Sequence, residues 1–312
     1  MIDILLAILN ISFLQAIVNM STPLLLAAIG DIYSERAGVL NIGLEGMMLV
    51  GAFSSFVISY HFNNPYIALI ITIIIGFGLG IFHAFFTVTL KADQVITALG
   101  ENILALGLTS TLYRIIIGVT EIQPECQGLP VLYIPAINRM PVVGDIMSGS
   151  TILVYIAFLM PIITYVIFEY TSFGLSIKAV GENPKAADSM GINVNVIRYI
   201  AVIISGIFAA LGGASLTIGG LKYFFDNMTA GRGFIAFAAV IFGRYTPLGV
   251  FMGTLLFGSS DAFQLRLQTL GIQLPYHIFT SIPYIVTLLA MIFSRQTSFS
   301  PKALGKAYVR SS

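Results

Sequence analysis

Apolar runs of helix length recur along this chain between Ile4 and Phe293, and no polar stretch between them is long enough to fold by itself. Backbone N–H and C=O groups without hydrogen-bond partners are costly in lipid, so helices and closed barrels are the structures that cross a membrane. Only 9% of the residues are charged, compared with about 25% in soluble domains. The sequence therefore predicts an all-α polytopic membrane protein, in which residues 1–295 form a single transmembrane domain.

The number of spans follows from the lengths of the runs. Seven runs have the length of a regular span: Ala37–Ser59, Tyr66–Leu90, Val95–Val119, Ile152–Phe168, Val196–Leu221, Pro247–Phe263 and Ile278–Phe293. The run Ile4–Ile29 is interrupted by Ser21-Thr22-Pro23, which fits one kinked span or a broken pair. The run Phe234–Phe242 is short and, with residues 227–233, crosses only as a half-helix joined to extended chain. We expect about nine transmembrane helices (range 8–10), with a broken or re-entrant segment near residues 227–243.

The distribution of basic residues predicts the orientation, because cytoplasmic loops carry an excess of Lys and Arg. Placing the C-terminus inside assigns most of the basic residues to the cytoplasmic side: Arg36, Lys91, Lys178, Lys185, Arg198, Arg244, Arg295, Lys302, Lys306 and Arg310. The outer side receives Arg114, Arg139, Lys222, Arg232 and Arg266. We therefore expect the N-terminus outside and a short basic cytoplasmic tail over residues 296–312.

A capped helix is predicted in the cytoplasmic loop at about residues 181–191. Asn183 suits the N-cap, Pro184 the first helical position and Gly191 a left-handed end. Ala186, Ala187 and Met190 fall at i, i+1 and i+4, which predicts a small apolar face that fits a cleft on another protein; an ordinary connector is the alternative. The predicted docking residues are Gly181, Glu182, Asn183, Pro184, Ala186, Ala187, Met190 and Gly191.

This loop and three other segments also resemble a known family. The loop reads GLSIKAVGENPKAADSMGINV and is followed by IRYIAVIISGIFAALGGASL. Together they resemble the permease subunits of bacterial ATP-binding cassette (ABC) importers in the branched-chain amino acid, ribose and simple-sugar family. The segments TPLLLAAIGDIYSERAGVLNIGLEGMMLVGAF and ADQVITALGENILALGLTSTL are most similar to its nucleoside (guanosine-type) branch.

The resemblance implies a function and a set of partners. The expected function is import of nucleosides or a related simple sugar across the bacterial cytoplasmic membrane, energised by a separate ATPase that docks on residues 181–191. The expected partners are this ATPase, a second permease chain forming a heterodimer, and an extracytoplasmic substrate-binding lipoprotein. The resemblance implies no cofactor on this chain, because ATP and Mg belong to the ATPase. The sequence has no Gly-rich phosphate loop ending in Gly-Lys-Ser/Thr, so we do not expect it to be an enzyme.

Polar residues inside membrane spans are expensive, so each is a candidate for function. Asn41 and Glu45 are expected at i and i+4 on the second span, and Gln94, Glu101 and Asn102 at a similar depth on the fourth. They predict a hydrogen-bonded cluster that either packs the helices or lines the translocation path. Glycines at 231, 233 and 243 let the backbone bend around the short run Phe234–Phe242. The backbone groups that such a break exposes can form polar contacts with a solute. The path candidates are Asn41, Glu45, Gln94, Glu101, Asn102, Asn227 and Arg232.

A proton-coupled secondary carrier is the alternative function, with Glu45 or Glu101 as the proton site. His83 is interpreted as a packed, hydrogen-bonded residue or as part of a proton relay. The spacing of His61, His83 and His277 predicts no metal site. We expect no catalytic residues, because the spans hold no nucleophile and base at a common depth.

Overall fold

The computed structural model describes residues 10–118, 123–135, 143–269, 285 and 300–309. These residues form helices, apart from loops and one small antiparallel pair, β1 (Val131–Leu132) with β2 (Ser150–Thr151). The short helix α7 (Val143–Met147) lies between the two strands. The predicted all-α class is confirmed, since this two-stranded pair is a minor feature of a loop.

Five of the described helices are long and apolar enough to cross a membrane. They are α2 (Ile11–Arg36), α4 (Pro65–Ala84) with its π-helical end η1 (Phe85–Thr89), α5 (Gln94–Ile116), α8 (Ile152–Tyr170), and α11 (Val194–Leu216) with its π-helical end η2 (Thr217–Leu221). The helices α3 (Leu44–Phe62) and α13 (Pro247–Thr269) are of similar length, and α12 (Arg232–Phe242) is a short apolar helix. A multi-pass membrane fold is confirmed, while the count of nine spans remains a prediction. The expected span Ile278–Phe293 lies outside the described residues.

The first span is one continuous helix through Pro23, rather than a broken pair. Its N-cap is Asn10, whose side chain accepts a hydrogen bond from the Phe13 amide at 2.9 Å. The Thr22 hydroxyl donates to the Val18 carbonyl at 2.7 Å, one turn back. This bond satisfies the Thr22 hydroxyl inside the helix, next to Pro23.

The second span differs from the prediction at its start. Residues 37–43 form a turn, and α3 begins only at Leu44. Gly38 has φ +85°, a left-handed conformation that glycine adopts without steric cost. The Asn41 side chain accepts a hydrogen bond from the Gly43 amide at 3.1 Å, which holds the turn closed. The prediction that Asn41 and Glu45 share one helix is therefore wrong, because Asn41 lies before the helix begins.

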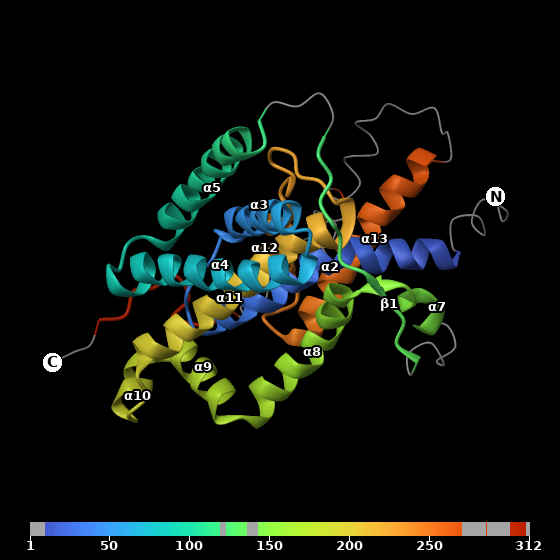
Figure 1. Cartoon of the computed structure of the whole chain (residues 1–312). Helices are drawn as coiled ribbons and strands as arrows, with labels where there is room; N and C mark the ends of the chain where they lie inside the picture. Colours follow the sequence, from blue (N-terminus) through green and yellow to red (C-terminus); the bar gives the residue numbers. More distant parts are fainter. Residues whose placement is uncertain (1–9, 119–122, 136–142, 270–284, 286–299, 310–312) are drawn as a thin grey trace.

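The helices α2 and α11 form the centre of the bundle, with α3, α4, α8, α12 and α13 packed around them (Figure 1). Glycine makes the closest approaches possible, as in many membrane helix pairs. A Cβ at Gly213 of α11 would overlap the Met48 carbonyl of α3, and one at Gly51 would overlap the Ala210 backbone. The long apolar spans are therefore held by backbone-to-backbone contact as well as by side chains.

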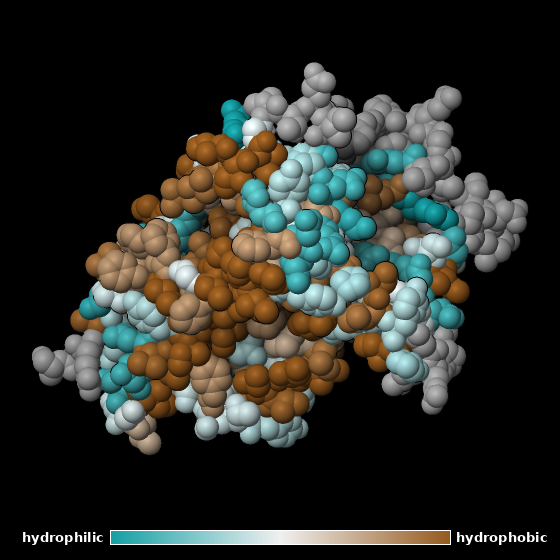
Figure 2. All heavy atoms as spheres, viewed as in Figure 1, coloured by the Kyte–Doolittle hydropathy of each residue, from teal (hydrophilic) through white to brown (hydrophobic). Residues whose placement is uncertain are grey.

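The outer surface of the bundle is strongly apolar. Figure 2 shows brown, apolar side chains across the face formed by α4 and α5. On these two helices Ile74 of α4 is 61% exposed, and Ile96 and Ile103 of α5 are 71% and 73% exposed. A soluble monomer rarely exposes so large an apolar patch, so this face is suited to lipid or to a membrane partner.

Two consecutive short helices, α9 (Ser172–Glu182) and α10 (Pro184–Ser189), connect α8 to α11. The predicted caps of the second are confirmed: the Asn183 side chain accepts a hydrogen bond from the Ala186 amide at 3.2 Å, and Pro184 is the first helical residue. Gly191 has φ +86° after the helix ends. The helix α9 was not among the predicted elements, although Thr171 caps it by accepting a hydrogen bond from the Gly174 amide at 3.1 Å.

Candidate functional site

The carboxylate of Glu45 binds the N-terminus of the short helix α12. Its Oε1 accepts a hydrogen bond from the Gly231 amide at 2.8 Å, and its Oε2 accepts one from the Gly233 amide at 2.7 Å. The first amides of a helix lack intrahelical partners and carry partial positive charge, so a carboxylate suits this position. A residue from α3 thus caps a helix that lies far away along the chain, and the Glu45 side chain is directed to α12.

The chain entering α12 has an irregular backbone, as the prediction of a broken segment required. Asn227 has φ +59°, Ala230 +47° and Gly231 +85°. A Cβ at Gly233 would overlap the backbone of Glu45, so only glycine allows this approach. Arg232 donates from Nη1 to the Thr229 carbonyl at 3.2 Å and is half-buried.

A second group of polar side chains from α5 holds the turn before α3. The Gln94 Oε1 accepts a hydrogen bond from the Leu40 amide at 2.7 Å. Asn102 accepts one from the Gly46 amide at 2.8 Å and donates to the Ile42 carbonyl at 3.2 Å. Gln94 and Asn102 thus bond the backbone around the turn rather than the side chains of Asn41 and Glu45, so the predicted side-chain cluster is wrong in its partners.

Glu101 belongs to this group through His83. Its Oε2 lies 2.8 Å from the Nδ1 of His83, which is fully buried on α4. The Nε2 of the same ring lies 3.3 Å from the Leu40 carbonyl. The interpretation of His83 as a packed, hydrogen-bonded residue is confirmed by these contacts.

A third group joins α2, the turn and α11. Asn41 donates from Nδ2 to the Ser205 hydroxyl at 2.9 Å, and Ser205 donates to Asp31 Oδ1 at 3.5 Å. Glu35 follows Asp31 by one turn, and both are fully buried. Within the described part of the chain, neither carboxylate oxygen of Glu35 has a hydrogen-bond partner.

Asp31, Glu35 and Ser205 were not among the residues predicted from the sequence. The predicted first span ended at Ile29, whereas α2 continues to Arg36 and holds both carboxylates at i and i+4. An acidic pair at helical spacing directly after an apolar run is the signal that could have extended the span over them. Most polar atoms of Asn41, Glu45 and Asn102 already bond to the protein's own backbone and side chains, so these residues fix the arrangement of α3, α5, α11 and α12. A role in a translocation path stays a prediction for all seven candidates, of which Asn227 is exposed and Arg232 half-buried.

The predicted docking helix has two opposed faces. Met190 is 83% exposed, whereas Ala187 is only 4% exposed and packs with Val180, Val194 and Tyr308. The expectation that Ala186, Ala187 and Met190 form one outward face is therefore wrong for Ala187, because the chain's own C-terminal segment covers it.

The remaining predicted docking residues fall into the same two groups. Glu182, Asn183 and Ala186 are exposed and Pro184 is half-buried, whereas Gly181 is buried, and a Cβ on it would overlap the Arg36 carbonyl. Gly191 is exposed, with open space where a Cβ would lie.

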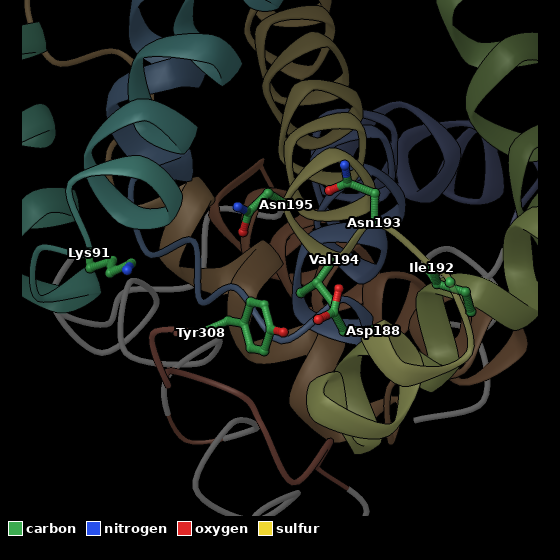
Figure 3. Close-up of a pocket in the computed structure, with 8 residues that line it drawn as sticks. Lys91, Asp188, Ile192, Asn193, Val194, Asn195 and Tyr308 are labelled. Atoms are coloured by element: carbon green, nitrogen blue, oxygen red, sulfur yellow. The ribbon is translucent and has the colours of Figure 1, made fainter. Parts of the chain in front are cut away.

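A hollow of about 320 Å³ lies beside this helix (Figure 3). Its lining is largely polar and comes from the turn after α4, from α10, from the start of α11 and from the C-terminal segment: Lys91, Asp188, Ile192, Asn193, Asn195 and Tyr308. A second hollow of about 360 Å³ also borders Tyr308 and is lined by Glu182, Lys185, Lys302 and Lys306 among others. The surface around α10 thus combines an exposed apolar tip with basic edges.

Comparison with known proteins gives a match to one family over most of the chain. Residues 13–294 match the family described as "Branched-chain amino acid transport system / permease component". The putative glucose ABC transporter permease protein TsgC13 of Haloferax volcanii is 40% identical, over 84% of this chain and 79% of the relative.

Two proteins of Bacillus subtilis are also similar. The guanosine ABC transporter permease protein NupQ is 35% identical, over 93% of this chain and 94% of the relative. The guanosine ABC transporter permease protein NupP is 26% identical, over 91% of this chain and 81% of the relative. No solved structure gives a significant match to the chain.

Proposed function

The chain belongs to the family of permease components of branched-chain amino acid transport systems, and on this basis we propose that it is the membrane-spanning subunit of an ABC importer for nucleosides. The family match over residues 13–294 carries the proposal, since it covers nearly all of the described helices. Relatives named for guanosine and for glucose both handle polar solutes with several hydroxyl groups. We favour a nucleoside because the guanosine permease NupQ matches over a larger share of both chains.

The partners in this proposal are an ATPase, a second permease and a substrate-binding lipoprotein. Two guanosine permease proteins of one organism, NupQ and NupP, are both similar to this chain, which supports pairing of two different permeases. ATP and Mg are bound by the ATPase and not by this chain. The N-terminus is placed outside and the C-terminus in the cytoplasm, in accordance with the distribution of basic residues.

Coupling proceeds through α10. ATP binding draws the two ATPase units together, and each carries the α10 helix docked on it. Met190 is the apolar tip that enters the ATPase, and the capped ends of α10 make it a rigid lever. The displacement reaches the spans through α9 and α11, and the pathway opens alternately to the two sides.

A proton-coupled secondary carrier is the second candidate. Its proton sites would be Asp31 and Glu35 rather than Glu45 or Glu101. Asp31 and Glu35 are buried in a span, and Glu35 makes no hydrogen bond to the described residues through its carboxylate. The carboxylates of Glu45 and Glu101 are already engaged by α12 and by His83.

The docking role is tested by changing Met190. Met190→Glu places a charge on an exposed apolar tip, so we expect normal expression but loss of the co-purified ATPase and of ATP-driven uptake. Met190→Leu keeps the apolar bulk and is the matched control, with wild-type behaviour expected. Unchanged recovery of the ATPase with Met190→Glu would contradict docking at α10.

Ala187→Arg, which the sequence alone suggests as the docking test, is unsuitable for it. Ala187 is packed inside the chain's own cluster, so the larger charged side chain is expected to disturb the local fold. Loss of uptake in that variant would therefore not distinguish docking from folding.

A further inference from the structure

The C-terminal segment returns to pack against the elements that surround the docking helix. The Ala303 amide donates to the Gly181 carbonyl at the end of α9, at 2.9 Å. Pro301 and Ala303 are buried. The Ala303 carbonyl lies against Gly38, where a Cβ would come within 3.1 Å of its oxygen. This segment therefore touches both the end of α9 and the turn that follows α2.

Arg198 joins the same segment to the bundle. It is only 1% exposed and lies in the first turns of α11. Its Nη1 donates to the Lys306 carbonyl at 2.9 Å, and its Nε donates to the Ala37 carbonyl at 3.2 Å. A buried guanidinium needs acceptors for its donors. Here the backbone carbonyls of Ala37 and Lys306 serve Nε and Nη1, while Nη2 has no partner among the described residues.

Tyr308 brings the C-terminal segment into contact with the region around α10. Its ring is 9% exposed and packs with Val180 of α9, Ala187 of α10 and Val194 of α11. Figure 3 shows the ring beside Val194 and Asp188, between the turn that carries Lys91 and the docking helix. This buried cluster thus joins the tail to α9, α10 and α11.

Arg198 also lies on the same helix as Ser205, which belongs to the buried polar group of Asp31, Asn41 and Ser205. Ser205 follows Arg198 by seven residues, which is about two helical turns and places both on one face of α11. Ser205 bonds to Asn41 and Asp31, which belong to the turn after α2 and to α2 itself. Arg198 contacts the first residue of that turn, Ala37, so the tail lies at the cytoplasmic end of this network.

We propose that residues 301–308 are a coupling strap that passes the displacement of α9 and α10 to α2 and α11. This inference rests on the proposed function, because the displacement comes from the docked ATPase. α10 contacts mainly α9 and α11, and α9 also contacts α2 and α11 directly, so the strap adds a second connection between these elements. With it, Tyr308 and Ala303 fasten α10 and α9 to a segment that Arg198 ties to the end of α2.

The test compares coupling in reconstituted importers made with Tyr308→Ala, Tyr308→Phe and Val309→Ala permeases. Tyr308→Ala removes the ring from the three-helix contact, while Tyr308→Phe keeps it. Val309 is 60% exposed beside Tyr308 and serves as the matched control. Liposomes contain this permease with its ATPase, second permease and binding protein, and the measured quantity is ATP hydrolysed per nucleoside imported.

We expect the Tyr308→Ala permease to keep the ATPase bound. The ATP hydrolysed per nucleoside imported should rise about fivefold or more, since coupling between two sites of a protein usually amounts to at least that factor. Tyr308→Phe and Val309→Ala are expected to keep the wild-type ratio. If Tyr308→Ala does not fold, Tyr308→Leu, which retains part of the apolar bulk, is measured in its place with the same expectation.

Two results would overturn the strap. One is a wild-type ratio in the assembled Tyr308→Ala complex. The other is loss of the ATPase from a folded Tyr308 variant, which would place the tail in docking rather than in transmission. Failure of the wild-type complex to import nucleoside with ATP would contradict the proposed function, and the strap with it, whereas a failure confined to the Tyr308 comparison contradicts the strap alone.

Discussion

Removal of the Glu45 carboxylate should destabilise the whole chain by releasing the short helix α12. Glu45 is 8% exposed and accepts hydrogen bonds from the Gly231 and Gly233 amides. Leaving a buried donor without a partner costs about 1–3 kcal/mol, so Glu45→Ala should cost about 2–6 kcal/mol. We expect the lower half of this range, because Gly231 is only half-buried. Loss of the favourable charge at the helix N-terminus adds about 0.3–2 kcal/mol.

The assay is reversible unfolding in lipid-containing micelles, with the free energy of unfolding as the readout. Glu45→Gln should fall between Glu45→Ala and the wild type, since the amide keeps one acceptor oxygen but places a donor against a second N–H. Glu169→Ala is the matched control: it removes a partly exposed carboxylate from its ion pair with Lys178, 2.6 Å away, and should cost only about 0–1 kcal/mol. A Glu45→Ala variant no less stable than Glu169→Ala would refute the capping role.

Two further predictions concern helix packing and the buried acids. Gly213→Ala should prevent assembly of α3 against α11 because its Cβ would overlap the Met48 carbonyl, whereas Gly100→Ala, with open space around it, should leave the thermal stability of the purified protein unchanged. Equal stability of the two variants would contradict the close packing. The double variant Asp31→Asn and Glu35→Gln should retain ATP-driven uptake in vesicles, because an ABC permease needs no titrating carboxyl there. Uptake abolished in a well-folded double variant would support the secondary carrier.

The elements that the sequence predicted well are those whose signals are local. The caps at Asn183, Pro184 and Gly191 act within a few residues of the helix that they bound, so α10 was located from the sequence. The long apolar runs likewise predicted α4, α5, α8 and α11 to within a few residues. The start of α3 was misplaced because hydrophobicity continues through residues 37–43, while Gly38 and Asn41 fold that stretch into a turn.

The features that were missed depend on contacts between distant parts of the chain. Glu45 was placed in a cluster with α5, but its hydrogen-bond partners lie 186 and 188 residues further along the sequence. Helical spacing put Ala187 on the outward face, and only the folded tail shows that Tyr308 covers it. Asp31 was missed because the predicted first span ended at Ile29, whereas α2 continues to Arg36.

The central claim is tested most directly by uptake of radiolabelled guanosine into liposomes that contain the purified permease with its ATPase, second permease and binding lipoprotein. The proposed function predicts uptake that requires ATP inside the liposomes, on the side of the ATPase. This uptake should persist when an ionophore collapses the proton gradient. Guanosine uptake that is lost with the proton gradient at constant ATP, or that proceeds without ATP, would contradict it.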